Sequence, residues 1–91
     1  MNNTIRRTEL DVALAGQHKL LQTFRGTHSF PQMADRQGIS YRKMREDGDE
    51  THRECEYAFS NRHGHPRRAV EMAHRTGDGW MYAVRIYEGD E

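Results

Sequence analysis

Residues 51–60 alternate strictly between two kinds of side chain, and this alternation constrains the fold more than any other feature of the chain. One side of the pattern carries Thr51, Arg53, Cys55, Tyr57 and Phe59, and the other carries His52, Glu54, Glu56, Ala58 and Ser60. A period of two is the spacing of a β-strand with one buried face, and it does not match the 3.6-residue period of a helix. The segment therefore predicts a strand, which needs neighbouring strands to be stable.

The second half of the chain supplies these neighbours. Residues 39–45 and 80–88 show the same period, and Asp-Gly-rich turn signals at 47–50 and 76–79 separate the candidate strands. In 80–88 we expect Trp80, Tyr82, Val84 and Ile86 to point inward and Met81, Ala83, Arg85 and Tyr87 to point outward. Short turns between successive strands predict an antiparallel meander over residues 39–88.

Residues 66–75 allow two interpretations. As a strand, they place Val70, Met72 and His74 on one face, but they can also be drawn as a helix that begins at Pro66. The strand is favoured because turn signals stand on both sides of the segment.

The first part of the chain shows a helical period instead. In residues 8–25, Thr8 is placed to cap a helix, and apolar residues recur at the 3.6-residue spacing. They are Leu10, Ala13, Leu14, Leu21 and Phe24, with Gln17 on the same face. Gly26 is a suitable stop. Residues 26–38 then read as a connection, in which Pro31 permits a short helix at 31–37.

Together these elements predict one α+β domain in two layers, since 91 residues suffice for a single domain. The N-terminal helix packs on a three- to four-stranded antiparallel β-meander, and a short acidic tail follows at 89–91. The lone Cys55 cannot form an intramolecular disulfide, and the start of the chain lacks the apolar core of a signal peptide. A cytoplasmic protein with no membrane span is therefore expected.

Charge narrows the functional classes. Fourteen Lys and Arg residues balance fourteen Asp and Glu residues, so electrostatic recognition requires local segregation of charge. Basic residues do cluster, on the first predicted strand and in the loop before the third. The candidate contacts to a protein or to nucleic acid are Arg42, Lys43, Arg45, Arg62, His63, His65, Arg67 and Arg68. The simpler alternative is an ordinary solvated surface.

Two chemical alternatives are less favoured. The six histidines and Cys55 contain neither a CxxC nor an HxxxH pair, so no metal site and no cofactor are predicted. Glycine-rich phosphate loops and nucleophile elbows are also missing, and Cys55 is expected to face the core, where thiols are inert. We therefore expect a protein without enzymatic activity.

Residues 33–45 carry a second hypothesis, because they resemble a helix-turn-helix DNA-binding motif. Ala34, Gly38, Ile39 and Met44 match its small, turn and core positions, and residues 40–45 would form the recognition helix. Gln37 and the following acidic turn depart from the motif. The alternative for this segment is a charged edge strand.

In size and expected architecture the whole chain resembles small phage-encoded anti-CRISPR proteins directed against type I surveillance complexes. That group has no shared motif, so no residue roles carry over from it. The resemblance implies a non-enzymatic inhibitor that binds Cas proteins and guide RNA in the host cytoplasm and blocks target DNA binding. The neutral net charge differs from that of acidic DNA mimics and favours contacts to protein and guide RNA.

Overall fold

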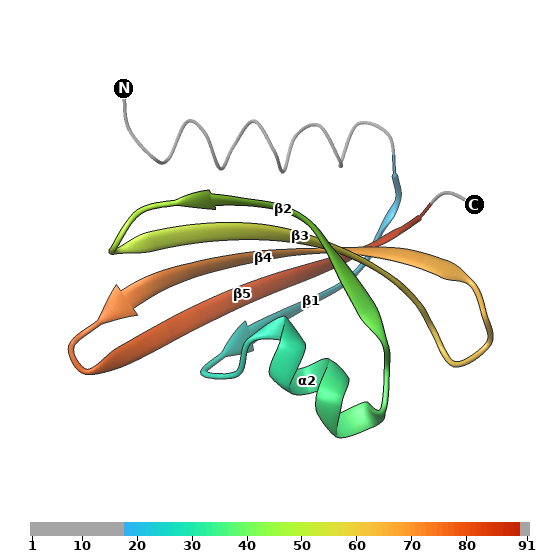
Figure 1. Cartoon of the computed structure of the whole chain (residues 1–91), viewed down its shortest axis with the longest axis horizontal. Coiled ribbons are helices and arrows are strands. Elements are labelled where there is room, and N and C mark those ends of the chain that lie inside the picture. Colours follow the sequence, from blue (N-terminus) through green and yellow to red (C-terminus); the bar gives the residue numbers. More distant parts are fainter. Residues whose placement is uncertain (1–17, 90–91) are drawn as a thin grey trace.

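The computed structural model describes residues 18–89, which form one twisted antiparallel sheet and one short helix (Figure 1). Along the chain the elements are β1 (Leu20–Gly26), α2 (Phe30–Gln37), β2 (Tyr41–Gly48), β3 (His52–Ser60), β4 (Pro66–Thr76) and β5 (Gly79–Glu88). The sheet order is β1-β5-β4-β3-β2. The chain therefore passes from one edge of the sheet to the other between β1 and β2, and α2 lies in that connection.

The predicted meander is confirmed. Strands β2 to β5 pair in sequence order, each antiparallel to the next. The ambiguous segment 66–75 is a strand, with Tyr57 opposite Ala69 in the register of β3 and β4. The short helix expected at 31–37 is also present, beginning one residue earlier at Phe30. An α+β class holds, with five strands rather than three or four.

The C-terminal part of the predicted helix 8–25 is wrong, whereas residues 8–17 lie outside the described residues. Leu20–Gly26 form strand β1, which pairs along β5 with Phe24 opposite Val84. Without β1, the outer edge of β5 would leave a row of backbone N–H and C=O groups unpaired. Pairing at this edge depends on a strand about sixty residues away in the sequence, so the local apolar period gave no sign of it.

Local signals define α2 sharply. The Ser29 side chain accepts from the backbone N–H of Gln32, and the Gln32 side chain accepts from the Ser29 N–H, which completes a capping box. Gly38 ends the helix in the left-handed region at φ 69°, and Ile39 N–H then donates to Ala34 O at 2.9 Å. Because both ends are capped by the chain itself, a helix of eight residues can be held in place.

The main core lies between α2 and one face of the sheet, which we call the helix face. Its buried members are Phe30, Ala34, Cys55, Tyr57, Ala69, Val84 and Ile86. Phe30 stands at the centre, with its ring 5.0 Å from Tyr57 and 5.1 Å from Phe59 between centroids. Aromatic packing of this kind adds to simple area burial, so Phe30 is the main anchor of the helix.

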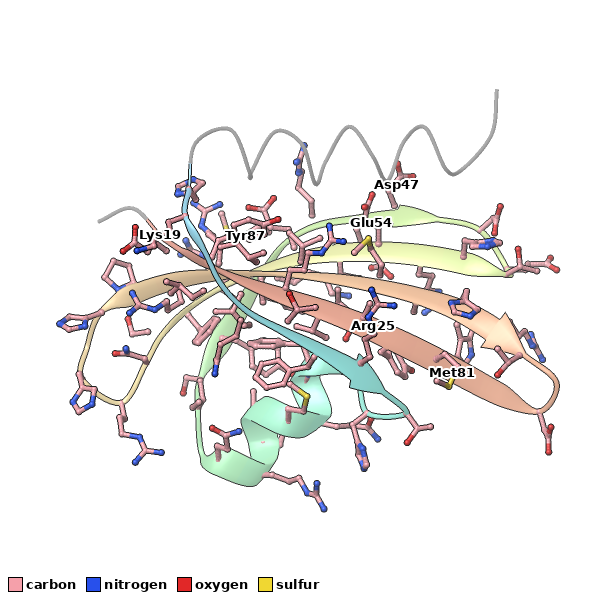
Figure 2. All side chains as sticks on the ribbon, turned by 180° about the vertical axis from the view of Figure 1, so that it is seen from behind. Lys19, Arg25, Asp47, Glu54, Met81 and Tyr87 are labelled. Carbon is pink, nitrogen blue, oxygen red and sulfur yellow. The ribbon has the colours of Figure 1, made fainter. Side chains whose placement is uncertain are left out.

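The opposite face of the sheet, which we call the far face, is also buried in part. Val70 and Tyr87 are almost completely inaccessible there, with Met72 beside them. The labels in Figure 2 show where Tyr87 and Glu54 lie on the sheet. The prediction that Tyr87 points outward is therefore wrong. A period of two assigns residues to faces, but it does not say that only one face is buried.

The helix-turn-helix hypothesis is wrong in its structural premise. The expected recognition helix falls on β2, so residues 41–45 are extended. Within residues 18–89, no helix is long and apolar enough to cross a membrane.

Candidate functional site

The turn between β3 and β4 displays three basic side chains, Arg62, His63 and His65, which we call the basic turn. Asn61 organises it, because its side-chain oxygen accepts from the backbone N–H groups of both His63 and His65 at 2.9 Å. Gly64 adopts φ 84°, a left-handed conformation that glycine takes without steric cost. All three basic side chains are exposed. The turn is therefore ordered by the Asn61 side chain and by its own backbone, which leaves the three basic side chains available for contacts.

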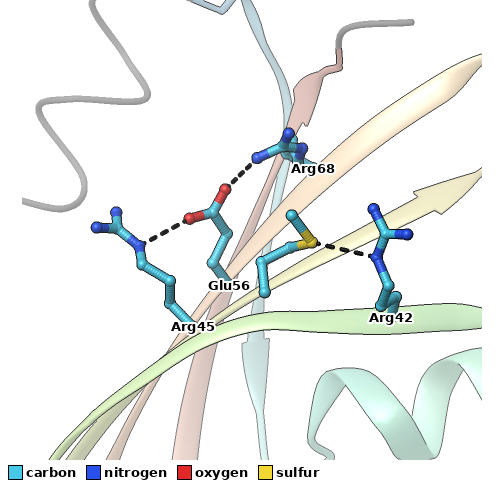
Figure 3. A network of polar contacts seen from close by, with 5 residues as sticks. Arg42, Arg45, Glu56 and Arg68 are labelled. Carbon is cyan, nitrogen blue, oxygen red and sulfur yellow. Dashed lines mark hydrogen bonds and ion pairs between the residues drawn. The ribbon is translucent and has the colours of Figure 1, made fainter.

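Two of the other predicted contact residues, Arg45 and Arg68, are held on the far face by a buried carboxylate. Glu56 has a side chain only 5% exposed, and it forms ion pairs with both Arg45 and Arg68 (Figure 3). The distance from Arg45 Nε to Glu56 Oε1 is 3.2 Å. Arg45 and Arg68 thus already serve to neutralise a buried charge, which Glu56 would otherwise carry at a high desolvation cost.

Of the three remaining candidates, Arg67 follows the basic turn on β4, and Arg42 and Lys43 lie on the edge strand β2. Lys43 forms an ion pair with Glu46 at 2.9 Å, and hydrogen bonding to Glu46 raises the pKa of Lys43. Arg42 places its Nε 3.4 Å from the sulfur of Met44. A bulge between Lys43 and Arg45 places Lys43 and Glu46 on the same side of the strand, so the two can pair.

An open groove of about 750 Å³ lies beside the basic turn, between α2 and the helix face. We call it the apolar groove. Its apolar lining consists of Leu21, Phe24, Phe30, Met33, Ala34, Ile39, Phe59 and Ile86. Its polar lining consists of Gln22, Gln37, Asn61, Arg62, His63 and Arg67. No Asp or Glu is among these described lining residues. The groove is therefore apolar along its length and basic at one end.

Two of the groove residues are unusually exposed for their type. Leu21 is 36% and Phe24 is 39% exposed, although both stand on a strand next to the core. The register of β1 shifts between Leu20 and Gln22, which places Leu21 at a bulge that also lines the groove. Apolar side chains exposed together in a hollow are typical of a binding surface.

A second, smaller hollow of about 180 Å³ lies near the start of α2, and its lining includes the N-cap Ser29 with Cys55, Tyr57 and Glu71. Glu71 is buried and accepts a hydrogen bond from the backbone N–H of Phe30, so it satisfies the start of α2. Burial raises the pKa of the Glu71 carboxyl group. Burial likewise raises the pKa of the Cys55 thiol, which therefore stays protonated at neutral pH.

We expect the substitution Glu71→Gln to stabilise the protein at pH 8 and to have little effect near pH 4. Because the folded-state pKa of Glu71 is raised, ionisation costs stability as pH rises above the unfolded-state value. Glutamine retains an oxygen that can accept from Phe30 N–H but carries no charge. Urea unfolding at several pH values measures the effect, and a difference between variant and wild type that does not grow with pH would contradict it.

Four of the six histidines form two pairs at opposite ends of the sheet. The rings of His52 and His74 are 6.3 Å apart, and the rings of His63 and His65 are also 6.3 Å apart. Between residues 18 and 89, no group of three or more His, Cys, Asp or Glu side chains could hold a metal ion.

Comparison of the chain with protein-family models, with curated proteins and with solved structures finds no match. Function must therefore be argued from the site itself.

The sequence predicted part of this site. The turn residues Arg62, His63 and His65 come together as expected. The groove was missed because Leu21 and Phe24 were assigned to a helix, and only their place on β1 brings them beside the turn. Glu71 was also missed, since no sequence signal distinguishes a buried helix-capping carboxylate from a surface one.

Proposed function

We propose that the protein is a non-enzymatic binding protein that contacts an anionic macromolecular partner through the basic turn and Arg67. The observation that carries this proposal is the distribution of charge. Arg45, Arg68 and Lys43 already pair with carboxylates, whereas Arg62 and Arg67 lie beside a groove whose described lining contains no acid. Arginine suits such contacts because its planar group can bind a phosphate or a carboxylate through two hydrogen bonds.

The partner we propose is a ribonucleoprotein, specifically a host CRISPR-Cas surveillance complex whose target DNA binding the protein blocks. A surface that combines basic and apolar groups suits a partner that presents RNA phosphates beside protein side chains. This end of the molecule has both, because the basic turn adjoins the exposed Leu21 and Phe24.

We expect the double substitution Arg62→Glu and Arg67→Glu to weaken binding to a purified type I surveillance complex by at least roughly a hundredfold, because two attractive contacts become repulsive. Calorimetry with the guide-RNA-loaded complex measures the affinity. Arg68 is left unchanged because it holds the buried Glu56.

The matched control is the double substitution Arg25→Glu and Arg75→Glu. It makes the same change in net charge at two exposed residues, which pair with Ala83 and Trp80 at the opposite end of the sheet. We expect it to retain the wild-type affinity. Equal loss in both double variants would show that total charge, rather than the basic turn, governs binding. Failure of the wild type to bind the complex would refute the proposed partner.

A further inference from the structure

We propose that the apolar groove is a binding site for a small amphipathic carboxylate, a free molecule with an apolar tail and one carboxylate group. Binding of this ligand would be a second activity that does not depend on the macromolecular partner. The volume of the groove, about 750 Å³, lies within the range of small-molecule sites. The groove is open to solvent, so a ligand can enter without unfolding α2.

The apolar lining of the groove would bury the apolar tail of the ligand. Leu21 and Phe24 come from β1, Met33 from α2, and Phe59 from β3, so the groove has apolar walls on more than one side. In the described structure Leu21 and Phe24 each leave more than a third of their surface accessible. An apolar chain lying between them and α2 would remove this surface from water, which provides the driving force for binding.

The basic end of the groove would bind the carboxylate group of the ligand. Arg62, His63 and Arg67 line the same end of the groove, together with the amide of Asn61. One Nη of Arg67 donates to the backbone oxygen of Pro66 at 2.8 Å, which restrains the guanidinium group while other N–H donors remain. A carboxylate here would gain charge-assisted hydrogen bonds, and no acidic side chain among the described lining residues competes for them.

One carboxylate lies close enough to the basic end of the groove to affect the charge there. Glu88 stands opposite Arg67 in the register of β4 and β5, although it does not line the groove. Glu88 lowers the local positive potential but leaves the net charge at the mouth positive, since Arg62 and Arg67 are both there. A ligand with a single negative charge therefore fits the site better than a neutral or cationic one.

The test is a titration of the full chain with octanoate, followed by amide chemical shifts in NMR spectra. We expect saturable shifts confined to the groove and the basic turn, and binding at least tenfold weaker for octanol, which lacks the charge. Arg67→Gln should weaken octanoate binding about tenfold. Its matched control, Arg75→Gln, changes the same strand at the opposite end and should bind as the wild type does.

A second pair of variants tests the tail. Phe24→Ser should weaken octanoate binding, whereas Leu20→Ser, on the same strand but outside the groove, should not. The proposal is overturned if the shifts are unsaturable or spread over the chain, or if octanol binds as tightly as octanoate. It is also overturned if an acidic peptide containing phenylalanine saturates the groove while octanoate does not, because the site would then serve a protein segment.

Discussion

Replacing Phe30 by alanine is expected to cost about 3–5 kcal/mol of folding free energy, the range measured for buried phenylalanines in other proteins. Phe30 is 4% exposed, and its ring meets Tyr41, Tyr57 and Phe59. Its backbone N–H also donates to Glu71, so the start of α2 is tied to the sheet at this residue. Small domains are stable by only about 5–15 kcal/mol, and the variant should therefore be partly or largely unfolded at moderate urea concentrations.

Urea unfolding followed by circular dichroism measures this effect. Phe24→Ala is the matched control, because Phe24 is 39% exposed and loses far less buried surface when truncated. We expect the control to shift the unfolding midpoint only slightly. If both substitutions cost the same free energy, Phe30 does not anchor α2 as described.

The second large effect concerns the buried carboxylate of the far face. We expect Glu56→Ala to destabilise the protein by about 2–4 kcal/mol, because breaking a buried ion pair leaves charged partners without compensation. Most of this cost comes from Arg68, because its side chain is only 24% exposed and its charge would stay partly buried. Arg45 is 60% exposed and can turn to solvent. The same substitution frees both guanidinium groups, and neither lies in the apolar groove.

Glu46→Ala provides the comparison. Its pair with Lys43 is exposed on both sides, so its loss should cost at most about 0.5 kcal/mol. Chemical unfolding of both variants in one buffer, at low and at high salt, separates the two cases. Equal costs for the two substitutions would mean that Glu56 is no more important than a surface carboxylate.

The sequence predicted the strands whose neighbours are adjacent along the chain. The alternation around Tyr57 and that around Val84 are each read locally, and short turns join these strands to the next. Strand β1 was not predicted, because its pairing with β5 is set by a vacant sheet edge and not by its own composition. Leu21 and Phe24 were assigned to the apolar face of the predicted helix 8–25, whereas they lie on strand β1.

The candidate site was likewise predicted only where its residues are adjacent in the sequence. The basic turn was predicted because Asn61, Gly64 and the basic side chains are contiguous in the sequence. Which arginines are already engaged was not predictable, since the pairing of Glu56 with Arg45 and Arg68 depends on strand register across three strands. Burial of Glu56 and Glu71 also contradicts the ordinary expectation that a charged residue in an alternating strand faces water.

Hydrogen–deuterium exchange of the whole protein, alone and mixed with the guide-RNA-loaded surveillance complex, tests most directly whether one end of the sheet makes the contact. We expect slower exchange across residues 59–68 in the complex and unchanged exchange across the turns at 49–51 and 77–78. Protection centred on those two turns instead, or no protection at any residue, would contradict the assignment of the basic turn as the contact surface.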